Sequence, residues 1–390
     1  MGGRTMKVVL SGFYGFGNMG DEAILQSIID NLRLRWPDIE ITVFSFSPEE
    51  TGQKHSVQSL YRGWRRETIK KIRALREADV LISGGGGLLQ DAYATGIISG
   101  PLPYYLLIVL LAKLCGTPVM FFSQGIGPIT SRYGKFLVRK IANKADLITV
   151  RDKESKELLR ALGVLKPEII VTADIVFALR TDRAPLPAVS EGPLNRPGKW
   201  VAVSVRPWFE QKDYLKQIGR ALDLLMETHH VTPVFFPMEG DYDYCAAEEV
   251  VRQMKNGNRS VLLKPGYSPE EMIGLLKKCQ LTIGMRLHSL IFSCLAEIPY
   301  IGIVYDPKVE NFLKATDMQA FAIAMNNIQP DRIVERYQYI INHEEEIGER
   351  IKQKKSELGR EALKNITLLE QYFLTESVGE KREHTASNHI

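Results

Sequence analysis

The stretch KVVLSGFYGFGNMGDE, residues 7–22, decides the fold of the first half of the chain. Its apolar opening predicts a strand over 6–13, and the periodic pattern after it predicts a helix over 22–36. The segment 12–22 at the junction of the two elements contains four glycines, and glycine lets a backbone approach a ligand closely. The N–H groups at the start of such a helix can hold anions or sugar hydroxyls. We therefore expect a ligand-binding loop here.

This loop differs from the familiar nucleotide-binding loops. Its glycine spacing is not G-x-G-x-x-G, and it contains no Walker lysine. The residues that we expect to bind a ligand are Gly15, Gly17, Asn18, Asp21 and Glu22. The alternative is a tight turn in which Asp21 caps the following helix.

Strand and helix patterns alternate on both sides of this stretch. In the first half the other strands are expected at 39–46, 79–84, 118–125, 147–152 and 168–174, with helices at 65–77, 104–115, 133–142 and 155–162. In the second half the strands are expected at 200–207, 232–238, 260–265, 281–286 and 300–306, with helices at 214–227, 246–255, 269–278 and 289–296. This alternation indicates βαβ units and parallel sheets. We predict an α/β protein with two Rossmann-like doubly wound domains facing a cleft.

The domain boundaries are expected where this pattern breaks. The first domain covers 1–180, and the Pro-rich segment 181–198 is typical of a linker. The second domain covers 199–329 and is followed by a long, charge-rich C-terminal helical segment over 330–374. The last residues, 375–390, show no periodicity that would build a core, so we expect a mobile tail.

The composition is that of an ordinary globular protein, with 45% hydrophobic and 25% charged residues among 390. The formal net charge is +4 and the basic residues are spread along the chain, which argues against a nucleic-acid partner. The four cysteines form no C-x-x-C pair, and no signal-peptide pattern is present. The longest apolar run, 102–115, is too short to span a bilayer and predicts a buried helix. We expect a cytoplasmic location.

Two further loops follow predicted strands. In open α/β sheets ligands bind beyond the carboxyl ends of the strands. The run SGGGGLLQD, residues 83–91, offers Gly85, Gly86, Gln90 and Asp91, and SQGIGP, residues 123–128, offers Gln124. Four consecutive glycines are conformationally costly, so they indicate close approach by a ligand or by another part of the backbone.

Three arginines occupy equivalent positions after strands. Arg151, Arg206 and Arg286 could together hold a small, highly charged anion, because each guanidinium can bind a carboxylate or phosphate through two hydrogen bonds. The alternative for Arg151 and Arg206 is a surface ion pair. Arg286 and Leu287 precede His288 at the entrance of an apolar helix, where N–H groups favour an anion. His288 is the one histidine of seven that we expect at a ligand site, where it could donate a proton.

The acidic residues Glu239, Asp241 and Asp243 also follow a predicted strand. Two interpretations are open for them: they orient sugar hydroxyls, or they cap the following helix. The sequence has neither H-E-x-x-H nor paired-cysteine spacing, so we expect no metal site.

The ordered motifs resemble those of the polysaccharide pyruvyl transferase family. They are GFGNMGDE at 15–22, SGGGGLLQD at 83–91, SQGIGP at 123–128, TVRD at 149–152, TAD at 172–174 and MRLHS at 285–289. The resemblance is strongest to bacterial members that act on the secondary cell-wall polysaccharide that anchors S-layer proteins. It implies a two-domain architecture of the GT-B glycosyltransferase type.

The resemblance also implies the chemistry. The donor would be phosphoenolpyruvate, a co-substrate, with no separate cofactor. The acceptor would be a sugar, expected to be the β-N-acetylmannosamine of a lipid-linked disaccharide, and the product a 4,6-O-ketal with release of phosphate. Arg286, Leu287 and His288 fall on the family's R-L-H element and Arg151 on its R-D element. We expect the donor on the second domain and the acceptor on the first.

Two other functions are compatible with the sequence. One is a GT-B glycosyltransferase that uses a nucleotide sugar, and the other is a noncatalytic sugar-binding protein of wall assembly. A lipid-linked acceptor would also place the enzyme at the inner face of the membrane. The segment with Trp64 and Ile69 carries six basic residues that could contact anionic lipid weakly, or could simply be a solvated helix face; they are Arg62, Arg65, Arg66, Lys70, Lys71 and Arg73. The sequence does not give the oligomeric state.

Overall fold

The computed structural model describes residues 5–63, 66–91, 100–180, 193–208 and 213–374. The chain divides into two compact units. The first consists of Met1–Phe16, Asp21–Leu179 and Leu358–Ile390, and the second of Gly17–Gly20 and Arg180–Glu357. The expected tail and residues 181–192 of the expected linker lie outside the described residues. The segment Gly17–Gly20 therefore belongs to the second unit, although its neighbours on both sides belong to the first.

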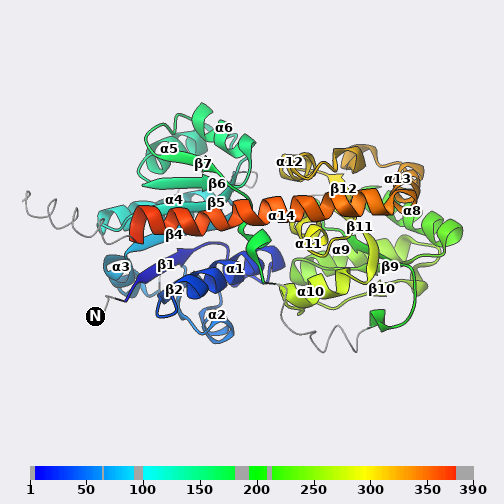
Figure 1. Ribbon diagram of the computed structural model, residues 1–390, viewed down its shortest axis with the longest axis horizontal. Helices are drawn as coiled ribbons and strands as arrows, with labels where there is room; N and C mark the ends of the chain where they lie inside the picture. Colours follow the sequence, from blue (N-terminus) through cyan, green and yellow to red (C-terminus); the bar gives the residue numbers. More distant parts are fainter. Residues whose placement is uncertain (1–4, 64–65, 92–99, 181–192, 209–212, 375–390) are drawn as a thin grey trace, which may run out of the picture. The chain divides into compact units, whose positions relative to one another are not determined.

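The first unit is built on a seven-stranded parallel sheet in the order β3-β2-β1-β4-β5-β6-β7 (Figure 1). The strands are β1 (Lys7–Ser11), β2 (Glu40–Ser45), β3 (Gln58–Tyr61), β4 (Val80–Leu89), β5 (Val119–Ile126), β6 (Leu147–Val150) and β7 (Glu168–Val171). The strand order reverses direction between β1 and β4. In sheets of this kind, ligands bind beyond the carboxyl ends of the strands at that point.

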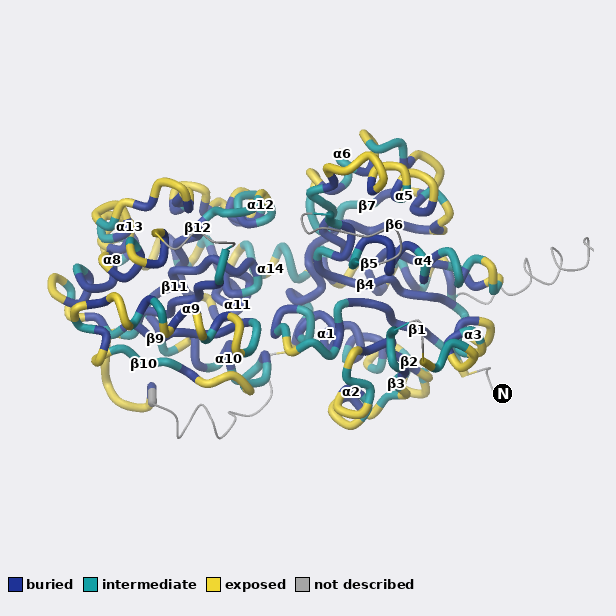
Figure 2. Tube along the Cα trace, turned by 180° about the vertical axis from the view of Figure 1, so that it is seen from behind, coloured by how far each residue is buried: buried dark blue, intermediate teal, exposed yellow. Residues whose placement is uncertain are grey.

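Helices connect these strands and cover the sheet. They are α1 (Met19–Arg35), α2 (Pro48–His55), α3 (Thr68–Glu77), α4 (Pro101–Leu114), α5 (Arg132–Ala142) and α6 (Lys153–Ala161). The apolar run at 102–115 forms α4, which packs on β4 and α5, so the prediction of a buried helix is confirmed. Figure 2 shows the central strands β4 and β5 buried. Within the described ranges, no helix combines the length and apolar character needed to cross a membrane.

The second unit contains a six-stranded parallel sheet in the order β10-β9-β8-β11-β12-β13. Its strands are β8 (Trp200–Ser204), β9 (Thr232–Phe235), β10 (Val261–Leu262), β11 (Cys279–Gly284), β12 (Tyr300–Val304) and β13 (Ala322–Ala324). Its helices include α8 (Asp213–His229), α9 (Gly240–Gln253), α10 (Pro269–Leu276), α11 (Leu287–Leu295), α12 (Pro307–Ala315) and α13 (Pro330–Asn342). The direction of strand order reverses between β8 and β11, so the prediction of two doubly wound sheets is confirmed.

The C-terminal helical segment contains α13 and the longer helix α14 (Glu344–Leu369), drawn in orange to red in Figure 1. Residues 344–357 of α14 belong to the second unit and 358–369 to the first. Asn365, fully buried, fixes the latter part on the first sheet: its Oδ1 accepts hydrogen bonds from the hydroxyls of Thr149 and Thr172, at 2.5 and 3.1 Å. A polar residue inside the helix thus satisfies two buried hydroxyls near the ends of β6 and β7.

Several elements were missed by the sequence pattern. Residues 48–61, expected as a connection, form α2 and the edge strand β3, whose QSLY sequence has no apolar run. The three-residue strand β13 is too short to show a period. By contrast, α12 had a recognisable signal, because Asp306 caps it by accepting the Lys308 N–H and Pro307 occupies its first position.

Candidate functional site

Arg286 lies where β11 passes into α11. The strand ends at Gly284, Arg286 is the N-cap residue of α11, and the helix begins at Leu287. A side chain at 284 would collide with the helix, because a Cβ there would lie 2.5 Å from Ser289 Oγ. His288 is the second residue of α11 and is half-buried. The sequence therefore places an arginine and a histidine together at the start of a tightly packed helix.

A buried carboxylate holds Arg286 in place. The Nε of Arg286 donates to both carboxylate oxygens of Asp243, at 3.2 and 3.0 Å, and its Nη2 donates to Asp243 Oδ1 at 2.6 Å. Nη2 also donates to Glu239. The side chain of Asp243 is fully buried and that of Arg286 is 10% exposed. This arrangement fixes the plane of the guanidinium and leaves Nη1 without a hydrogen bond to any described residue.

Asp243 also organises the backbone after β9. Its Oδ2 accepts the N–H groups of Met238 and Glu239, at 3.1 and 3.0 Å. Helix α9 starts at Gly240, six residues earlier than predicted, with Glu239 at its N-cap position but without a side-chain capping bond. Asp241 is exposed in the first turn. Neither interpretation given above describes Asp243, whose carboxylate is engaged by Arg286.

The electrostatics of this pair follow from burial and attraction. Burial raises the pKa of Asp243, and the attraction of Arg286 opposes that rise. Burial disfavours the charged guanidinium, but the attraction and hydrogen bonds of Asp243 outweigh it and raise the pKa of Arg286. Repulsion from Arg206 also acts on Arg286. Strands β8 and β11 are neighbours with Ser204 opposite Gly284, so Arg206 and Arg286, each two residues further on, follow adjacent strand ends at the same edge of the sheet.

Arg206 follows β8 and is surrounded by aromatic rings. Its Nη1 donates to the hydroxyl of Tyr305 at 3.2 Å. Its guanidinium carbon lies 5.5 Å from the Trp208 ring and 5.4 Å from the Tyr305 ring. Trp208 and Tyr305 were missed in the sequence, although Trp208 follows the strand predicted at 200–207 and Tyr305 lies at the end of the one predicted at 300–306.

The segment Gly17–Gly20 lies beside this cluster within the second unit. Met19 N–H donates to Met238 carbonyl oxygen at 2.8 Å, and Asn18 forms an isolated antiparallel bridge with Glu239. A Cβ on Gly20 would lie 2.1 Å from His288 Nδ1, so only glycine leaves room for the imidazole. Two of the residues expected to bind the acceptor, Gly17 and Asn18, are thus part of the unit expected to bind the donor.

Asn18, rather than Asp21, caps α1. The helix starts at Met19, and Asn18 Oδ1 accepts the Gly20 N–H at 3.1 Å. Asp21 lies inside the first turn, so its interpretation as a cap is wrong. Gly15 and Glu22 hold the loop together, since Gly15 N–H donates to Glu22 Oε1 at 2.8 Å. Burial raises the pKa of Glu22.

The four-glycine run is part of β4, and the prediction of a loop at 83–91 is wrong for residues 83–89. Gly85 and Gly86 have φ of +68° and +70°. A Cβ on Gly85 would lie 2.1 Å from Ile24 Cγ2, and one on Gly86 would lie 2.8 Å from Asp21 Oδ1. The glycines let α1 lie directly on β4, through the side chains of Ile24 and Asp21. A role of Gly85 and Gly86 in acceptor binding stays a prediction.

The polar residues after β4 and in β5 have structural partners. Asp91 accepts hydrogen bonds from the N–H and hydroxyl groups of Thr130 and Ser131, at 2.6 to 3.1 Å. Burial opposes its ionisation, but these bonds outweigh it and lower the pKa of Asp91. Gln124 is fully buried and donates to Ser83 O at 2.8 Å. Asp91 thus fixes the loop at Thr130 and Ser131, whereas Gln124 links β5 to β4. Acceptor roles for Gln90, Asp91 and Gln124 stay predictions.

Arg151 belongs to the first unit and forms a buried ion pair. Its Nη1 lies 2.8 Å from Asp174 Oδ2, and its Nε lies 3.8 Å from Asp152 Oδ2. The alternative of an ion pair is therefore the one that the structure shows, although the pair is buried rather than on the surface. A donor role for Arg151 stays a prediction.

The basic segment expected at the surface is only partly exposed. Lys71 is fully buried, and its Nζ donates to the carbonyls of Tyr61, Arg62 and Gly63. The guanidinium of Arg62 stacks over the rings of Phe16, Tyr104 and Tyr105 at 4.1 to 5.2 Å. Lys70 and Arg73 pair with Glu67 and Glu77, while Trp64 and Arg65 lie outside the described residues. Lys71 and Arg62 are therefore wrongly included in a lipid-facing patch.

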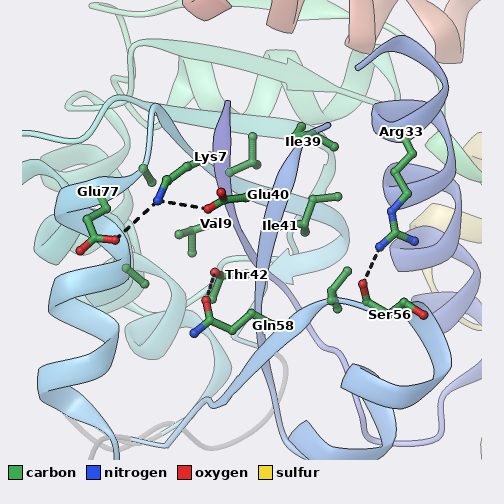
Figure 3. Close-up of a pocket in the computed structure, with 14 residues that line it drawn as sticks. Lys7, Val9, Arg33, Ile39, Glu40, Ile41, Thr42, Ser56, Gln58 and Glu77 are labelled. Carbon is green, nitrogen blue, oxygen red and sulfur yellow. Dashed lines mark hydrogen bonds and ion pairs between the residues drawn. The ribbon is translucent and has the colours of Figure 1, made fainter. Parts of the chain in front are cut away.

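A cavity of about 330 Å³ lies at the opposite end of the first sheet (Figure 3). Lys7, Glu40 and Gln58 line it at the amino ends of β1, β2 and β3. Lys7 Nζ lies 3.1 Å from Glu40 Oε2 and 3.9 Å from Glu77 Oε2, as the dashed lines in Figure 3 show. Ligands of such sheets bind at the carboxyl ends, so this cavity is not the candidate site.

The two doubly wound sheets place the protein in the GT-B class of α/β folds. Similar solved structures include a putative UDP-N-acetylglucosamine 2-epimerase from Listeria monocytogenes, with a TM-score of 0.68, 12% identity and coverage of 95% of this chain and 97% of that one. The UDP-GlcNAc 2-epimerase from Neisseria meningitidis has a TM-score of 0.64, 12% identity and coverage of 94% and 100%. HepE from Anabaena, solved with UDP and glucose, has a TM-score of 0.58, 12% identity and coverage of 98% and 100%. At these identities the similarity concerns the fold alone.

The sequence comparisons are more specific. Residues 18–307 match the polysaccharide pyruvyl transferase family. The amylovoran biosynthesis protein AmsJ of Erwinia amylovora is 24% identical over 403 residues, covering 89% of this chain and 94% of that protein. The chain belongs to the polysaccharide pyruvyl transferase family.

Proposed function

We propose that the protein transfers the enolpyruvyl group of phosphoenolpyruvate to a sugar, forming a 4,6-O-ketal and releasing phosphate. The observation that carries the proposal is the grouping of Arg286, Arg206 and His288 in the second unit, at the carboxyl ends of β8 and β11. Phosphoenolpyruvate carries a phosphate and a carboxylate, and two guanidiniums suit both. Phosphoenolpyruvate is then a co-substrate, and no separate cofactor takes part.

Arg286 is the donor-binding residue that this geometry supports best. Asp243 fixes its Nε and Nη2, which orients the remaining Nη1 edge for an oxygen of the donor. The amino end of α11 adds N–H groups and a partial positive charge beside it. Arg206, whose Nη1 donates a hydrogen bond to the Tyr305 hydroxyl, would bind the other anionic group of phosphoenolpyruvate. A guanidinium held before binding loses little entropy when the ligand arrives.

His288 is the proposed general acid. It donates a proton to the methylene carbon of phosphoenolpyruvate, and the adjacent carbon gains oxocarbenium character. A sugar hydroxyl then attacks that carbon and forms a C–O bond. The bond between that carbon and the phosphate oxygen breaks, and the second hydroxyl closes the ring. Of the two protons that the hydroxyls lose, one restores the protonated His288 and the other leaves with the phosphate. Arg286 and Arg206 stabilise the negative charge on the leaving group.

The acceptor that we propose is a sugar of a lipid-linked glycan, bound by the first unit. The specific candidate is the β-N-acetylmannosamine of a disaccharide carried on undecaprenyl diphosphate, for the wall polymer that anchors S-layer proteins. The choice of this particular sugar rests on the motif resemblance. The family match supports the more general proposal that the acceptor is a polysaccharide or its precursor. A cytoplasmic enzyme with weak contact to the inner membrane leaflet would meet such an acceptor.

The test is an incubation with phosphoenolpyruvate and β-N-acetylmannosaminyl glycolipid, with phosphate release and product mass as readouts. A matched incubation replaces phosphoenolpyruvate with UDP-N-acetylglucosamine. We expect stoichiometric phosphate release and a pyruvyl mass gain in the first reaction alone. Sugar transfer from UDP-N-acetylglucosamine, without reaction of phosphoenolpyruvate, would instead identify a nucleotide-sugar glycosyltransferase.

A further inference from the structure

A second cavity, of about 820 Å³, opens at the carboxyl ends of β2 and β3 in the first unit. Phe46 follows β2 directly and Tyr61 is the last residue of β3, and both line the cavity. Its volume falls in the range of roughly 300–1,000 Å³ that is usual for ligand sites. Its lining residues are separate from those that we expected to bind an acceptor.

The rings of Phe46 and Tyr61 form one side of this cavity, and the rings of Phe16 and Phe13 stack behind Phe46. Phe13 stacks on Phe16 with ring centres 4.1 Å apart, Phe16 stacks on Phe46 at 4.5 Å, and Phe46 contacts Tyr61 at 6.2 Å. Phe46 is 47% exposed in spite of these contacts. An exposed ring that is stacked from behind offers a rigid apolar surface, and the C–H face of a sugar ring is a matching partner.

Polar groups surround that surface. Glu49, Glu50 and Gln53 from α2 line the cavity together with Arg66 and Glu67 near the start of α3. The carboxylates of Glu49 and Glu50 are exposed and can accept hydrogen bonds from hydroxyls. Lys70 pairs with Glu67 at 2.8 Å, so the lining charges that remain are those of Glu49, Glu50 and Arg66, which sum to −1. Phosphates, uronic acids and nucleotides are repelled by this charge, whereas a neutral polyhydroxyl ligand is not.

The walls are fixed before any ligand binds. Phe46 N–H donates to Tyr14 O at 3.0 Å, and Ser47 Oγ donates to Gly15 O at 2.9 Å. A Cβ on Gly15 would lie 2.2 Å from Ser45 Oγ, so glycine is required for this contact. On the other wall, buried Lys71 binds the carbonyls of residues 61–63, and Glu67 Oε2 accepts the Tyr61 N–H at 2.8 Å. A preformed cavity binds with a smaller entropy loss.

We propose that this cavity is a binding subsite for an uncharged saccharide, with the Phe46 ring against a sugar face and the α2 carboxylates on its hydroxyls. The identification of that saccharide as part of the acceptor rests on the proposed function. The binding itself depends only on the aromatic surface, the carboxylates and the volume of the cavity.

The test measures binding of the full-length protein to an array of soluble oligosaccharides that includes neutral hexose, N-acetylhexosamine and uronic acid members. We expect binding to neutral and N-acetylated members and none to uronic acid members. Phe46→Ala should weaken saccharide binding about tenfold. The stacking contact that the variant loses has a free energy that corresponds to roughly a tenfold change in affinity. Glu49→Gln with Glu50→Gln should weaken it as well.

Phe136→Ala is the matched control, because Phe136 is a similarly exposed phenylalanine of the same unit, on α5. It should bind like the unmodified protein. Absence of binding to every array member, binding to uronic acid members alone, or equal affinity of Phe46→Ala and Phe136→Ala would overturn the proposal.

A second measurement, thermal stabilisation by phosphoenolpyruvate, distinguishes failure of the saccharide subsite from failure of the proposed pyruvyl transfer. Thermal stabilisation by phosphoenolpyruvate reports on the Arg286 cluster and should be unchanged in Phe46→Ala. If phosphoenolpyruvate does not stabilise the unmodified protein but saccharide binding still depends on Phe46, the saccharide subsite stands and the pyruvyl transfer proposal fails.

Discussion

At the scale of single residues, the feature that the sequence could not show is that Arg286 is already bound by carboxylates. Its position after a strand and before an apolar helix was predictable from the LTIGMRLHS pattern. Its partner Asp243 lies 43 residues away in sequence. Because spacing along the chain carries no information about such a pair, the three acidic residues after β9 were indistinguishable until the fold was known.

Asp243→Asn tests whether this pair orients Arg286 for the donor that we propose. Without the carboxylate of residue 243, the buried positive charge of Arg286 loses its main negative partner. We therefore expect the free energy of unfolding to fall by about 3 kcal/mol. The KM for phosphoenolpyruvate should rise by about tenfold, because the guanidinium loses its fixed plane. Chemical denaturation and steady-state kinetics measure the two effects.

The matched control for this variant is Asp241→Asn, which changes an exposed aspartate in the same first turn of α9. It should leave stability and KM unchanged. An Asp243→Asn variant with the KM of the unmodified enzyme would show that the ion pair has no part in donor binding.

We expect His55 to make the free energy of unfolding depend on pH. Burial, with smaller contributions from Lys54 and Arg33, lowers the pKa of His55 to about 4. In the unfolded chain its pKa is ~6.5. Between these values the unfolded chain binds a proton that the folded chain does not. The free energy of unfolding should therefore fall as the pH drops from 6.5 to 4, by up to about 3 kcal/mol, with no contribution above 6.5.

Urea denaturation across pH 4–7 of the unmodified protein and of His55→Leu measures this contribution. The variant should show a flatter pH dependence, whereas His343→Ala, which changes a histidine that stacks on Tyr339 at the end of α13, should not. An unchanged slope in His55→Leu would exclude His55 as the source.

At the scale of elements, the glycine run of β4 shows how one sequence signal supports two interpretations. Consecutive glycines indicated a close approach, and the structure identifies the approaching group as α1, through Ile24 and Asp21. The run continues the strand rather than ending it, because backbone hydrogen bonding to β5 persists beyond Ser83. The period of the apolar residues could not show this, since glycine has no side chain to carry the pattern.

Gly85→Ala should therefore act on stability. At φ +68°, with Ile24 2.1 Å from the new Cβ, the strain and the overpacking together should cost about 3 kcal/mol. Gly116→Ala is the control, because Gly116 has φ +80° with nothing within 4 Å, and should cost about 1 kcal/mol. Chemical denaturation measures both. Equal losses in the two variants would mean that α1 does not press on β4.

At the scale of the whole molecule, the fold was largely predictable because the longer strands of the described residues carry apolar runs and most of their longer helices an amphipathic or apolar pattern. What escaped prediction were the short edge elements β3 and β13 and the assignment of Gly17–Gly20 to the second unit. That assignment depends on contacts of Asn18 and Met19 with residues 238 and 239, more than 200 positions later. Local patterns do not report contacts at such separations.

The net charge of +4 was also a poor guide to local electrostatics. The strand-end arginines Arg286 and Arg151 are paired with Asp243 and Asp174, and the cavity beside Phe46 has a negative lining. Total charge therefore says little about which anions or sugars the protein binds.

We propose above that His288 delivers a proton to the methylene carbon of phosphoenolpyruvate. The most direct measurement is the reaction in D₂O with phosphoenolpyruvate and the β-N-acetylmannosaminyl glycolipid, followed by mass spectrometry and NMR of the product. We expect a ketal whose methyl group carries one deuterium, and a rate for His288→Ala that is lower by about 10²- to 10⁴-fold while donor binding is retained. A product without deuterium in its methyl group, or His288→Ala with the unmodified rate, would contradict it.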